Sequence, residues 1–324
     1  MRRLASIFVL PLLMLATGQL ARAVTSAADA PHVHVQLVVP ASAINRGAVA
    51  DAGLYFKIDP GWHVYWKNAG DAGEPPHMKW TLPDGITAGP LEFPAPKRLP
   101  LGPLMDFGYE DEVLFPFKVT VADAAKPGWA ILHAKVDWLV CQASCIPGKA
   151  ELEVTRGIAS QPSKAAFVPQ DLDLFKRLSS RLPKPLPEEM KVIFQPTKEG
   201  FRLSVDTGRR ETSATFFPAD QDVIQNPAPQ TLTPTPNGLT LDLKKDANLT
   251  ADPTELKGVL ELSGGRAYDI AAAAGTLAQG ASPSAPASPA ASPAASAAAP
   301  KSAAPISSPR ATMLRNAWVL MSAA

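Results

Sequence analysis

Alternation of apolar and polar residues is the main pattern of residues 30–157. It recurs in short runs, of which the clearest are "HVHVQLVV" (32–39), "LYFKI" (54–58) and "FPFKVTV" (115–121). A period of two places the apolar side chains on one face of an extended strand. Turn-forming triplets such as Asp59-Pro60-Gly61 separate the runs. Many short strands without a long amphipathic helix predict an all-β fold, with a β-sandwich over residues 30–157.

A second region rich in predicted strands follows. The segment "DLDLFKRLSSRL" (171–182) predicts a helix, which the prolines after it would end. The segment "KVIFQPTKEGFRLSV" (191–205) predicts a hairpin that turns at 198–200. We therefore predict a second, smaller β-rich domain over residues 165–272. It contains no cysteine and no histidine, so packing and spacing are its expected roles.

The two ends of the chain have compositions of their own. Residues 1–23 begin with the arginine pair Arg2-Arg3, continue with an apolar run and end with the small-x-small triplet Ala21-Arg22-Ala23, which predicts a secretory signal peptide cleaved near Ala23. A membrane anchor is the alternative, but the apolar run is shorter than the roughly 20 residues that span a bilayer. Residues 273–312 are almost wholly Ala, Ser and Pro, which predicts a disordered linker. Residues 313–324 would then be a truncated or loose tail.

The charge of the chain is nearly balanced, with 31 Lys and Arg side chains against 30 Asp and Glu side chains. It gives no electrostatic reason to expect nucleic acid as a partner. His32 and His34 fall on the polar face of the first predicted strand, whereas His63 and His77 lie in predicted loops without a surrounding motif. We expect no cofactor and no resident metal.

The segment "WLVCQASCIPG" (138–148) holds both cysteines of the chain, Cys141 and Cys145. On a continuous strand their Cα atoms would be roughly 13 Å apart, whereas a disulfide requires them within about 7 Å. If the two cysteines pair, the chain must therefore turn at Gln142-Ala143-Ser144. A loop this small would stabilise the fold by only about 2 kcal/mol.

The strand before the pair predicts which side Cys141 faces. Cys141 shares a parity with polar positions such as His133 and Lys135, and we therefore expect it on the accessible side of the strand. The opposite parity has the composition of a core face: Leu132, Ala134, Val136, Trp138 and Val140.

Three chemistries are compatible with such a pair. A disulfide in an exported protein is often structural. Two thiolates also suit a soft ion such as Cu(I), with His133, or His32 and His34, as further ligands, although CxxxC is not the usual zinc spacing. Thiol–disulfide exchange needs an accessible thiolate and a second thiol that resolves the mixed disulfide. The residues by themselves leave these alternatives open: a redox module, or a non-enzymatic binding protein that handles Cu(I) or carries a structural disulfide.

Four blocks of sequence, in this order, resemble a known family. They are "WHVYWKNAGDAGEPPHMKWTLPDG" (62–85), "GPLEFPAP" (89–96), "GYEDEVLFPFKV" (108–119) and "DWLVCQASCIPG" (137–148). Together they resemble the N-terminal periplasmic domain of the thiol:disulfide interchange protein DsbD, in particular its ScsB-like branch, over residues 30–157. The resemblance implies an immunoglobulin-like sandwich, a periplasmic location and a redox-active pair in which Cys145 forms the mixed disulfide and Cys141 resolves it.

The resemblance also implies a cap loop and redox partners. In that family, a flexible loop with an aromatic residue covers the cysteine pair as a cap. The segment "MDFGYED" occupies the matching place, so Phe107, with Asp106 and Tyr109 beside it, is the expected cap. Ordinary sandwich packing is the alternative for Phe107.

The implied electron acceptors are periplasmic thioredoxin-like oxidoreductases, with links to cytochrome c assembly and copper tolerance. The implied donor is a membrane-embedded domain, which this sequence lacks, as it lacks a thioredoxin-like domain. The donor would thus act in trans or belong to a missing part of the chain. The best-described members of the family space their cysteines more widely. The role of each cysteine is therefore left open, and so is the enzymatic activity that the family implies, that of a protein-disulfide reductase.

Overall fold

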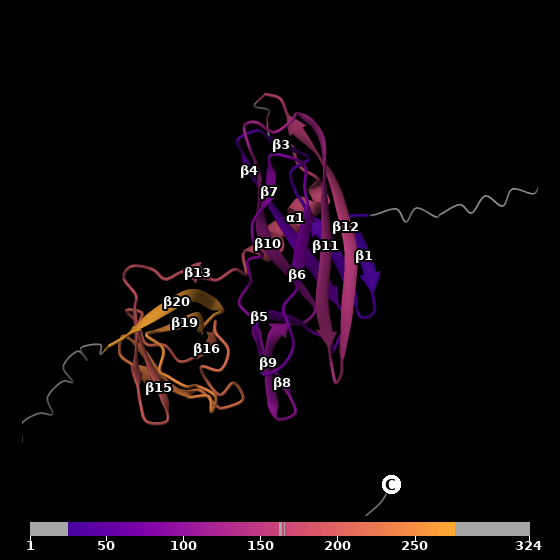
Figure 1. Cartoon of the computed structure of the whole chain (residues 1–324). Coiled ribbons are helices and arrows are strands. Elements are labelled where there is room, and N and C mark those ends of the chain that lie inside the picture. Colours follow the sequence, from indigo (N-terminus) through magenta and orange to yellow (C-terminus); the bar gives the residue numbers. More distant parts are fainter. Residues whose placement is uncertain (1–24, 162–163, 165, 276–324) are drawn as a thin grey trace, which may run out of the picture. The chain divides into compact units, whose positions relative to one another are not determined.

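The computed structural model describes residues 25–161, 164 and 166–275. Strands dominate these residues, and the described part of the chain contains one α-helix (Figure 1). The predicted all-β fold is therefore confirmed. The signal peptide predicted at 1–23, the tail predicted at 313–324 and nearly all of the linker predicted at 273–312 lie outside the described residues. Ala273 and Ala274, at the start of that linker, are the last residues of a strand.

The first β domain is a sandwich with two main sheets. The larger sheet has the strand order β1-β2-β4-β10-β7, with β1 at Ala27–Ala30, β2 at Val33–Val38, β4 at Val49–Ile58, β10 at Glu112–Val121 and β7 at Ile86–Ala88. The other has the order β3-β12-β11-β6, with β3 at Ala43–Asn45, β12 at Cys145–Ala159, β11 at Gly128–Cys141 and β6 at His77–Thr81. The three alternating runs of the sequence lie on β2, β4 and β10, as predicted.

The core lies between these two sheets. The face of β11 predicted to be buried is buried: Leu132, Ala134, Val136, Trp138 and Val140. Phe56 of β4 meets Trp138 edge-on, with ring centroids 5.6 Å apart, so an aromatic pair joins the sheets. Complete burial of one such large apolar side chain contributes about 2 kcal/mol.

A third, smaller sheet lies at the loop end of the hairpin formed by β11 and β12. It has the order β5-β9-β8, with β5 at Val64–Gly70, β9 at Leu104–Tyr109 and β8 at Lys97–Leu101. His63, which directly precedes β5, forms an antiparallel bridge with Cys141. This bridge places the small sheet beside Cys141. In Figure 1, β5, β9 and β8 lie near the loop end of the hairpin.

The second β domain has one eight-stranded sheet and its own core. The order is β16-β19-β20-β14-β15-β18-β17, with β13 beside β20. The strands are β13 (Lys184–Pro185), β14 (Lys191–Pro196), β15 (Gly200–Asp206), β16 (Ala214–Pro218), β17 (Thr231–Thr235), β18 (Gly238–Lys244), β19 (Glu255–Leu262) and β20 (Arg266–Ala274). Strands β14 and β15 form the predicted hairpin. Phe194 and Phe201 pack edge-on in this core, with ring centroids 5.6 Å apart.

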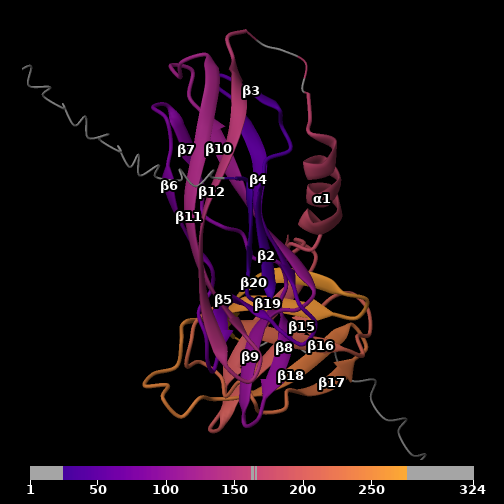
Figure 2. The same cartoon turned by 90° about the vertical axis from the view of Figure 1, so that its right-hand side faces the viewer.

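The helix α1 (Pro169–Ser179) precedes this domain and packs on the larger sheet of the sandwich (Figure 2). It begins two residues before the predicted start and ends three residues before the predicted end, with a proline in its first turn. Leu178 is buried against Tyr55 and Leu114 of that sheet. The sequence therefore predicted the helix correctly and its bounds only approximately.

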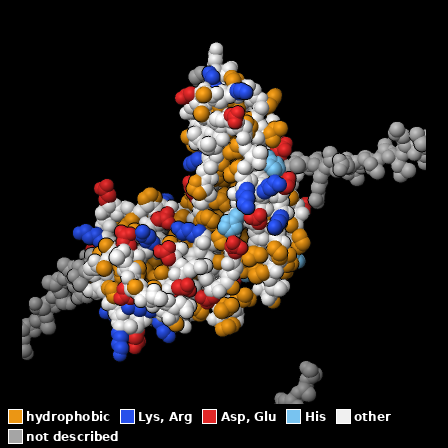
Figure 3. Space-filling model, in the orientation of Figure 1, with side chains coloured by type: hydrophobic (Ala, Val, Ile, Leu, Met, Phe, Trp, Pro, Cys, Tyr) orange, Lys and Arg blue, Asp and Glu red, His pale blue; other side chains and the backbone are white. Residues whose placement is uncertain are grey.

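The two β domains belong to the same compact unit of the chain. Phe217 and Val259 of the second domain are part of the hydrophobic core cluster of the first. On the face shown in Figure 3, acidic and basic side chains are interspersed. Within the described residues, no helix combines the length and the hydrophobicity that a bilayer span requires.

Candidate functional site

The two cysteines form a disulfide that closes the hairpin of β11 and β12. Cys141 and Cys145 are the last antiparallel pair of the two strands, and their Cα atoms are 4.1 Å apart. The chain turns at Gln142-Ala143-Ser144, where the backbone N–H of Gln142 donates to the carbonyl oxygen of Ser144 at 3.1 Å. The turn that the spacing required is therefore confirmed.

Cys141 is fully buried, with an exposed fraction of 0%. The prediction that its parity would leave it accessible is wrong. The reason is tertiary: β5 covers the outer face of β11 at this end, and the backbones of His63 and Cys141 exchange two hydrogen bonds of 2.9 and 3.0 Å. Tyr65 and Ala69 of β5 pack against Cys141. Val140 thus faces the sandwich core and Cys141 faces the small sheet.

Cys145, in contrast, is exposed. The three turn residues before it, Gln142, Ala143 and Ser144, are exposed as well. The two halves of one disulfide therefore differ in accessibility. Cys145 is therefore the sulfur that faces solvent, while Cys141 lies beneath β5.

A buried polar cluster lies beside the disulfide. The hydroxyl oxygen of Tyr65 is 3.6 Å from the Sγ atom of Cys145 and donates to Oδ2 of Asp106 at 3.5 Å. The Nε2 atom of His63 lies 3.5 Å from the same Asp106 oxygen. The side chain of Asp106 is 0% exposed and that of His63 is 9% exposed. The side chains of Tyr65 and His63 thus converge on one buried carboxylate, that of Asp106, next to the sulfur atoms.

The Tyr65 hydroxyl is held in its protonated form. Its pKa lies well above the ordinary value, first because the group is buried and then because the charge of Asp106 and the hydrogen bond to it disfavour the phenolate. A protonated hydroxyl has one hydrogen to donate, to Asp106 or to Cys145. Within this cluster, His63 Nε2 and Asp106 Oδ1 are buried without a hydrogen-bond partner.

The three predicted cap residues lie on β9 and face opposite ways. Asp106 points to the cluster beside the disulfide, whereas Phe107 and Tyr109 belong to the main core. The Phe107 ring packs against Phe217, and the Tyr109 hydroxyl donates to the carbonyl oxygen of Pro94 at 2.7 Å. The cap role of Phe107 stays a prediction. In this disulfide-bonded structure, the aromatic ring that contacts the cysteines is that of Tyr65.

Two residues of the site were not predicted from the sequence, His63 and Tyr65. The sequence interpretation placed His63 in a loop without a motif, but the structure buries it next to Cys141. Both residues fall in the block that starts at Trp62, which carried part of the family resemblance. The resemblance was therefore the signal that pointed to this segment, while the parity of the strand gave no indication.

The histidines considered as metal ligands each have a carboxylate partner. His32 contacts Asp59 at 3.2 Å, His34 contacts Asp29 at 2.7 Å and His133 contacts Glu151 at 3.4 Å. Within the part of the chain that the structure describes, no group of three or more His, Cys, Asp or Glu side chains is arranged to hold a metal ion.

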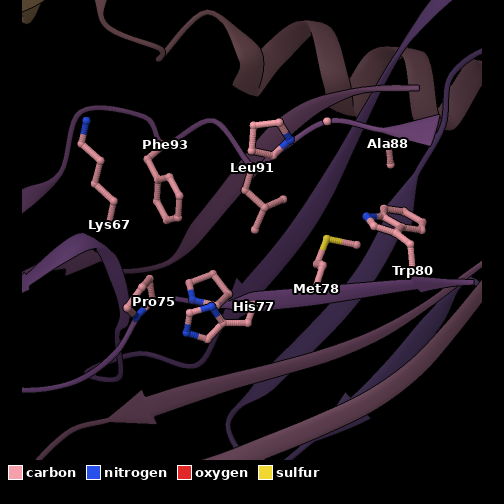
Figure 4. A pocket seen from close by; sticks show the side chains of 11 residues that line it. Lys67, Pro75, His77, Met78, Trp80, Ala88, Leu91 and Phe93 are labelled. Atoms are coloured by element: carbon pink, nitrogen blue, oxygen red, sulfur yellow. The ribbon is translucent and has the colours of Figure 1, made fainter. Parts of the chain in front are cut away.

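A mainly apolar pocket of about 450 Å³ lies elsewhere on the first β domain. Its lining includes Met78 and Trp80 of β6 together with Leu91 and Phe93, whose side chains surround the opening in Figure 4. Neither cysteine lines this pocket. It is separate from the disulfide site.

Comparison with known proteins agrees with the geometry of the disulfide site. Residues 34–156 match the family model described as thiol:disulfide interchange protein DsbD, N-terminal. Residues 34–156 form a DsbD N-terminal-like domain. This DsbD N-terminal-like domain includes both cysteines, His63, Tyr65 and Asp106.

A solved structure resembles a larger part of the chain. The N-terminal periplasmic domain of ScsB from Proteus mirabilis matches with a TM-score of 0.58 and 16% sequence identity, covering 78% of this chain and 98% of that one. At this identity the similarity shows a shared fold, which extends beyond the DsbD N-terminal-like domain. The comparison with curated proteins found no match.

Proposed function

We propose that the chain is a thiol–disulfide exchange module whose Cys141–Cys145 pair passes electrons to a disulfide of a partner protein. The observation that carries this proposal is the unequal burial of one bonded pair. Cys145 is exposed and Cys141 lies beneath β5. Exchange chemistry uses such an arrangement, because one sulfur must meet the partner and the other must be kept for the second step.

The exchange has two steps. In the reduced protein, the Cys145 thiolate attacks one sulfur of the partner disulfide, forms a mixed disulfide and releases the other partner sulfur as a thiolate. The Cys141 thiolate then attacks Sγ of Cys145, re-forms the Cys141–Cys145 bond and releases the second partner thiolate. The pair loses two electrons, the partner gains them, and the partner thiolates take up two protons from solvent.

The polar cluster supports the first step. The Tyr65 hydroxyl lies within hydrogen-bonding distance of Cys145 Sγ. When the bond is open, this hydroxyl donates to the Cys145 thiolate and stabilises its charge. In the disulfide-bonded form the same hydroxyl donates to the buried Asp106 carboxylate, so opening of the bond would redirect its one hydrogen to the thiolate. Tyr65 is therefore a positioning and stabilising group for the attacking sulfur.

The expected partners are thioredoxin-like oxidoreductases of the periplasm, with a membrane-embedded domain as the electron donor. The family match supports redox partners of this kind. A periplasmic location is supported by the signal peptide predicted for residues 1–23 and by the periplasmic ScsB domain of similar fold. Contributions to cytochrome c assembly or to copper tolerance would follow from the identity of the partner. In such a relay the module would act as a protein-disulfide reductase.

A trapping experiment tests this proposal. In Cys141→Ser the mixed disulfide on Cys145 cannot be resolved, so a periplasmic thioredoxin-like protein should accumulate as a covalent adduct. Cys145→Ser is the matched control and should capture none. If neither variant captures an oxidoreductase, the relay is excluded.

The reduction potential of the pair distinguishes exchange from a structural disulfide. A potential above about −300 mV would support exchange, whereas a lower one would indicate a structural bond. Stoichiometric Cu(I) binding by the reduced protein, lost in Cys145→Ser, would instead support a copper-handling protein.

A further inference from the structure

The small sheet of β5 and β9 has two faces that meet different parts of the protein. On one face, Tyr65 and Asp106 lie at the disulfide. The next residues along the chain, Trp66 and Phe107, point to the other face because side chains alternate along a strand. Their rings meet Phe217 of the second β domain. The strands that cover Cys141 are therefore packed between the hairpin and the second domain.

The apolar part of this contact is a cluster of three aromatic rings. The ring centroid of Phe217 lies 5.4 Å from that of Phe107 and 6.2 Å from that of Trp66, both in edge-on arrangements. All three side chains are at most 1% exposed. Fully buried aromatic clusters of this kind supply most of the energy of a protein interface. Loss of the Phe217 ring would leave a cavity directly behind β9.

Hydrogen bonds also join the second domain to β5 and to the residue that follows it, Asp71. The Asn68 side chain donates to the carbonyl oxygens of Pro218 and Asp220 at 2.9 and 3.1 Å. The Asn226 side chain donates to Oδ1 of Asp71 at 2.8 Å, and the other oxygen of Asp71 accepts the backbone N–H of Met105 at 2.8 Å. The second domain is thus bonded directly to β5 through Asn68, and it is linked to β9 through Asp71.

The same segment also covers Tyr65. A Cβ atom on Gly73 would lie 2.1 Å from the Tyr65 ring, so the backbone at this glycine rests directly on the ring. Gly73 follows Asp71 by two residues. Displacement of the Asp71 region would therefore move the backbone that holds Tyr65 over the cysteines.

We propose that the second β domain positions the exchange site, with Phe217 and Asn226 holding β5 and β9 against the hairpin so that Cys141 stays inaccessible and incoming thiols react at Cys145. This inference deepens the proposed function and rests on it for its biological meaning. The physical basis is local stability: a three-stranded sheet without a core of its own opens easily unless both faces are packed. Phe217 and Asn226 are positioning residues, because they act through the two strands and do not touch a cysteine.

Alkylation of the reduced full-length protein tests the proposal without any partner. A short pulse of iodoacetamide converts an accessible thiolate into a thioether with release of iodide, and mass spectrometry measures the modification of each cysteine separately. In the wild type, Cys145 should react and Cys141 should be protected. In Phe217→Ala, Cys141 should react about tenfold faster, because the cavity makes local opening more frequent.

Three variants separate positioning from general destabilisation. Phe217→Leu keeps most of the apolar contact and should restore protection of Cys141. Phe194→Ala removes an equivalent ring from the core of the second domain, away from this contact. Circular dichroism establishes that it is folded, and in the folded protein Cys141 should stay protected. Equal labelling of Cys141 in the folded Phe194→Ala and Phe217→Ala proteins would overturn the proposal.

A milder variant keeps the test decisive if Phe217→Ala does not fold. Asn226→Ala removes the hydrogen bond to Asp71 and should speed Cys141 alkylation about threefold, as expected for one hydrogen bond. Asn248→Ala, at an exposed asparagine of the same domain, is its control. Wild-type protection of Cys141 in Asn226→Ala and in any folded Phe217→Ala would refute the positioning role. Because alkylation needs no partner, a failed trapping experiment would exclude the relay and leave this result unaffected.

Discussion

The hydroxyl oxygen of buried Tyr65 lies 3.6 Å from the Sγ atom of exposed Cys145. The contact joins β5 to the first residue of β12, two elements that are distant in the sequence. It brings a hydrogen-bond donor to the sulfur that faces solvent, while the ring of the same tyrosine covers Cys141. One side chain thus influences both cysteines, in different ways.

Tyr65→Phe should lower the reactivity of Cys145 without unfolding the protein. The ring that covers Cys141 is kept, but the donor to the Cys145 thiolate is lost, so the pKa of that thiol should rise and its alkylation near neutral pH should slow about fivefold. The pH dependence of iodoacetamide labelling measures this. Tyr109→Phe is the control, because its hydroxyl donates to Pro94 and not to the site. An unchanged Cys145 profile in Tyr65→Phe would show that the hydroxyl serves Asp106 alone.

Gly73→Ala should disturb the site through Tyr65. Gly73 has a φ of +93°, and an added Cβ would overlap the Tyr65 ring at 2.1 Å. We expect destabilisation by about 3 kcal/mol from backbone strain and overpacking together, and faster alkylation of Cys141. Gly208→Ala has the same type of backbone, with φ at +74°, but nothing within 4 Å of the added atom. Urea unfolding of both variants isolates the steric part, and equal losses of stability would contradict this interpretation.

Asp171→Ala should destabilise the attachment of α1 to the sandwich. Oδ2 of Asp171 accepts from Arg156 at 2.9 Å and from the backbone N–H of Val39 at 3.2 Å, and both charged side chains are nearly buried. Removal of the carboxylate leaves the Arg156 charge without its partner, so the free energy of unfolding should fall by about 3 kcal/mol. Asp173→Ala changes an exposed carboxylate on the same helix and should have little effect. Chemical denaturation measures both, and similar values would rule out the buried pair as the cause.

Acid should weaken the contact between α1 and β10 through Glu112. The pKa of Glu112 lies below its ordinary value of 4.5, chiefly because of the hydrogen bond from Arg177, while burial opposes the shift. A carboxyl whose pKa is lower in the folded state stabilises the fold above the unfolded pKa and loses this contribution as the pH falls through the folded pKa. The wild type should therefore exceed Glu112→Gln in stability near neutral pH, and the difference should shrink below about pH 4.5. Unfolding curves of both proteins as a function of pH test this, and parallel curves would disprove it.

Local patterns in the sequence were sufficient for the strands and for the hairpin turn. The parity of β11 identified its core face because each of those side chains packs into the interior of its own sandwich. The separation of Cys141 and Cys145 required a turn because an extended chain holds them too far apart to bond. Both predictions depend on geometry within a few residues.

The accessibility of each cysteine depended instead on contacts between distant segments. Cys141 has the parity of the solvent face, yet β5 covers it, and no pattern within β11 encodes a strand that arrives from elsewhere in the chain. The same holds for His63, Tyr65 and Asp106, which only the pairing of β5 with β9 and the hairpin brings together. The sequence by itself thus determined that two sulfurs meet at a tight turn. Only the tertiary structure decided which of them faces solvent, because burial depends on what packs against a strand as well as on the direction in which its side chains point.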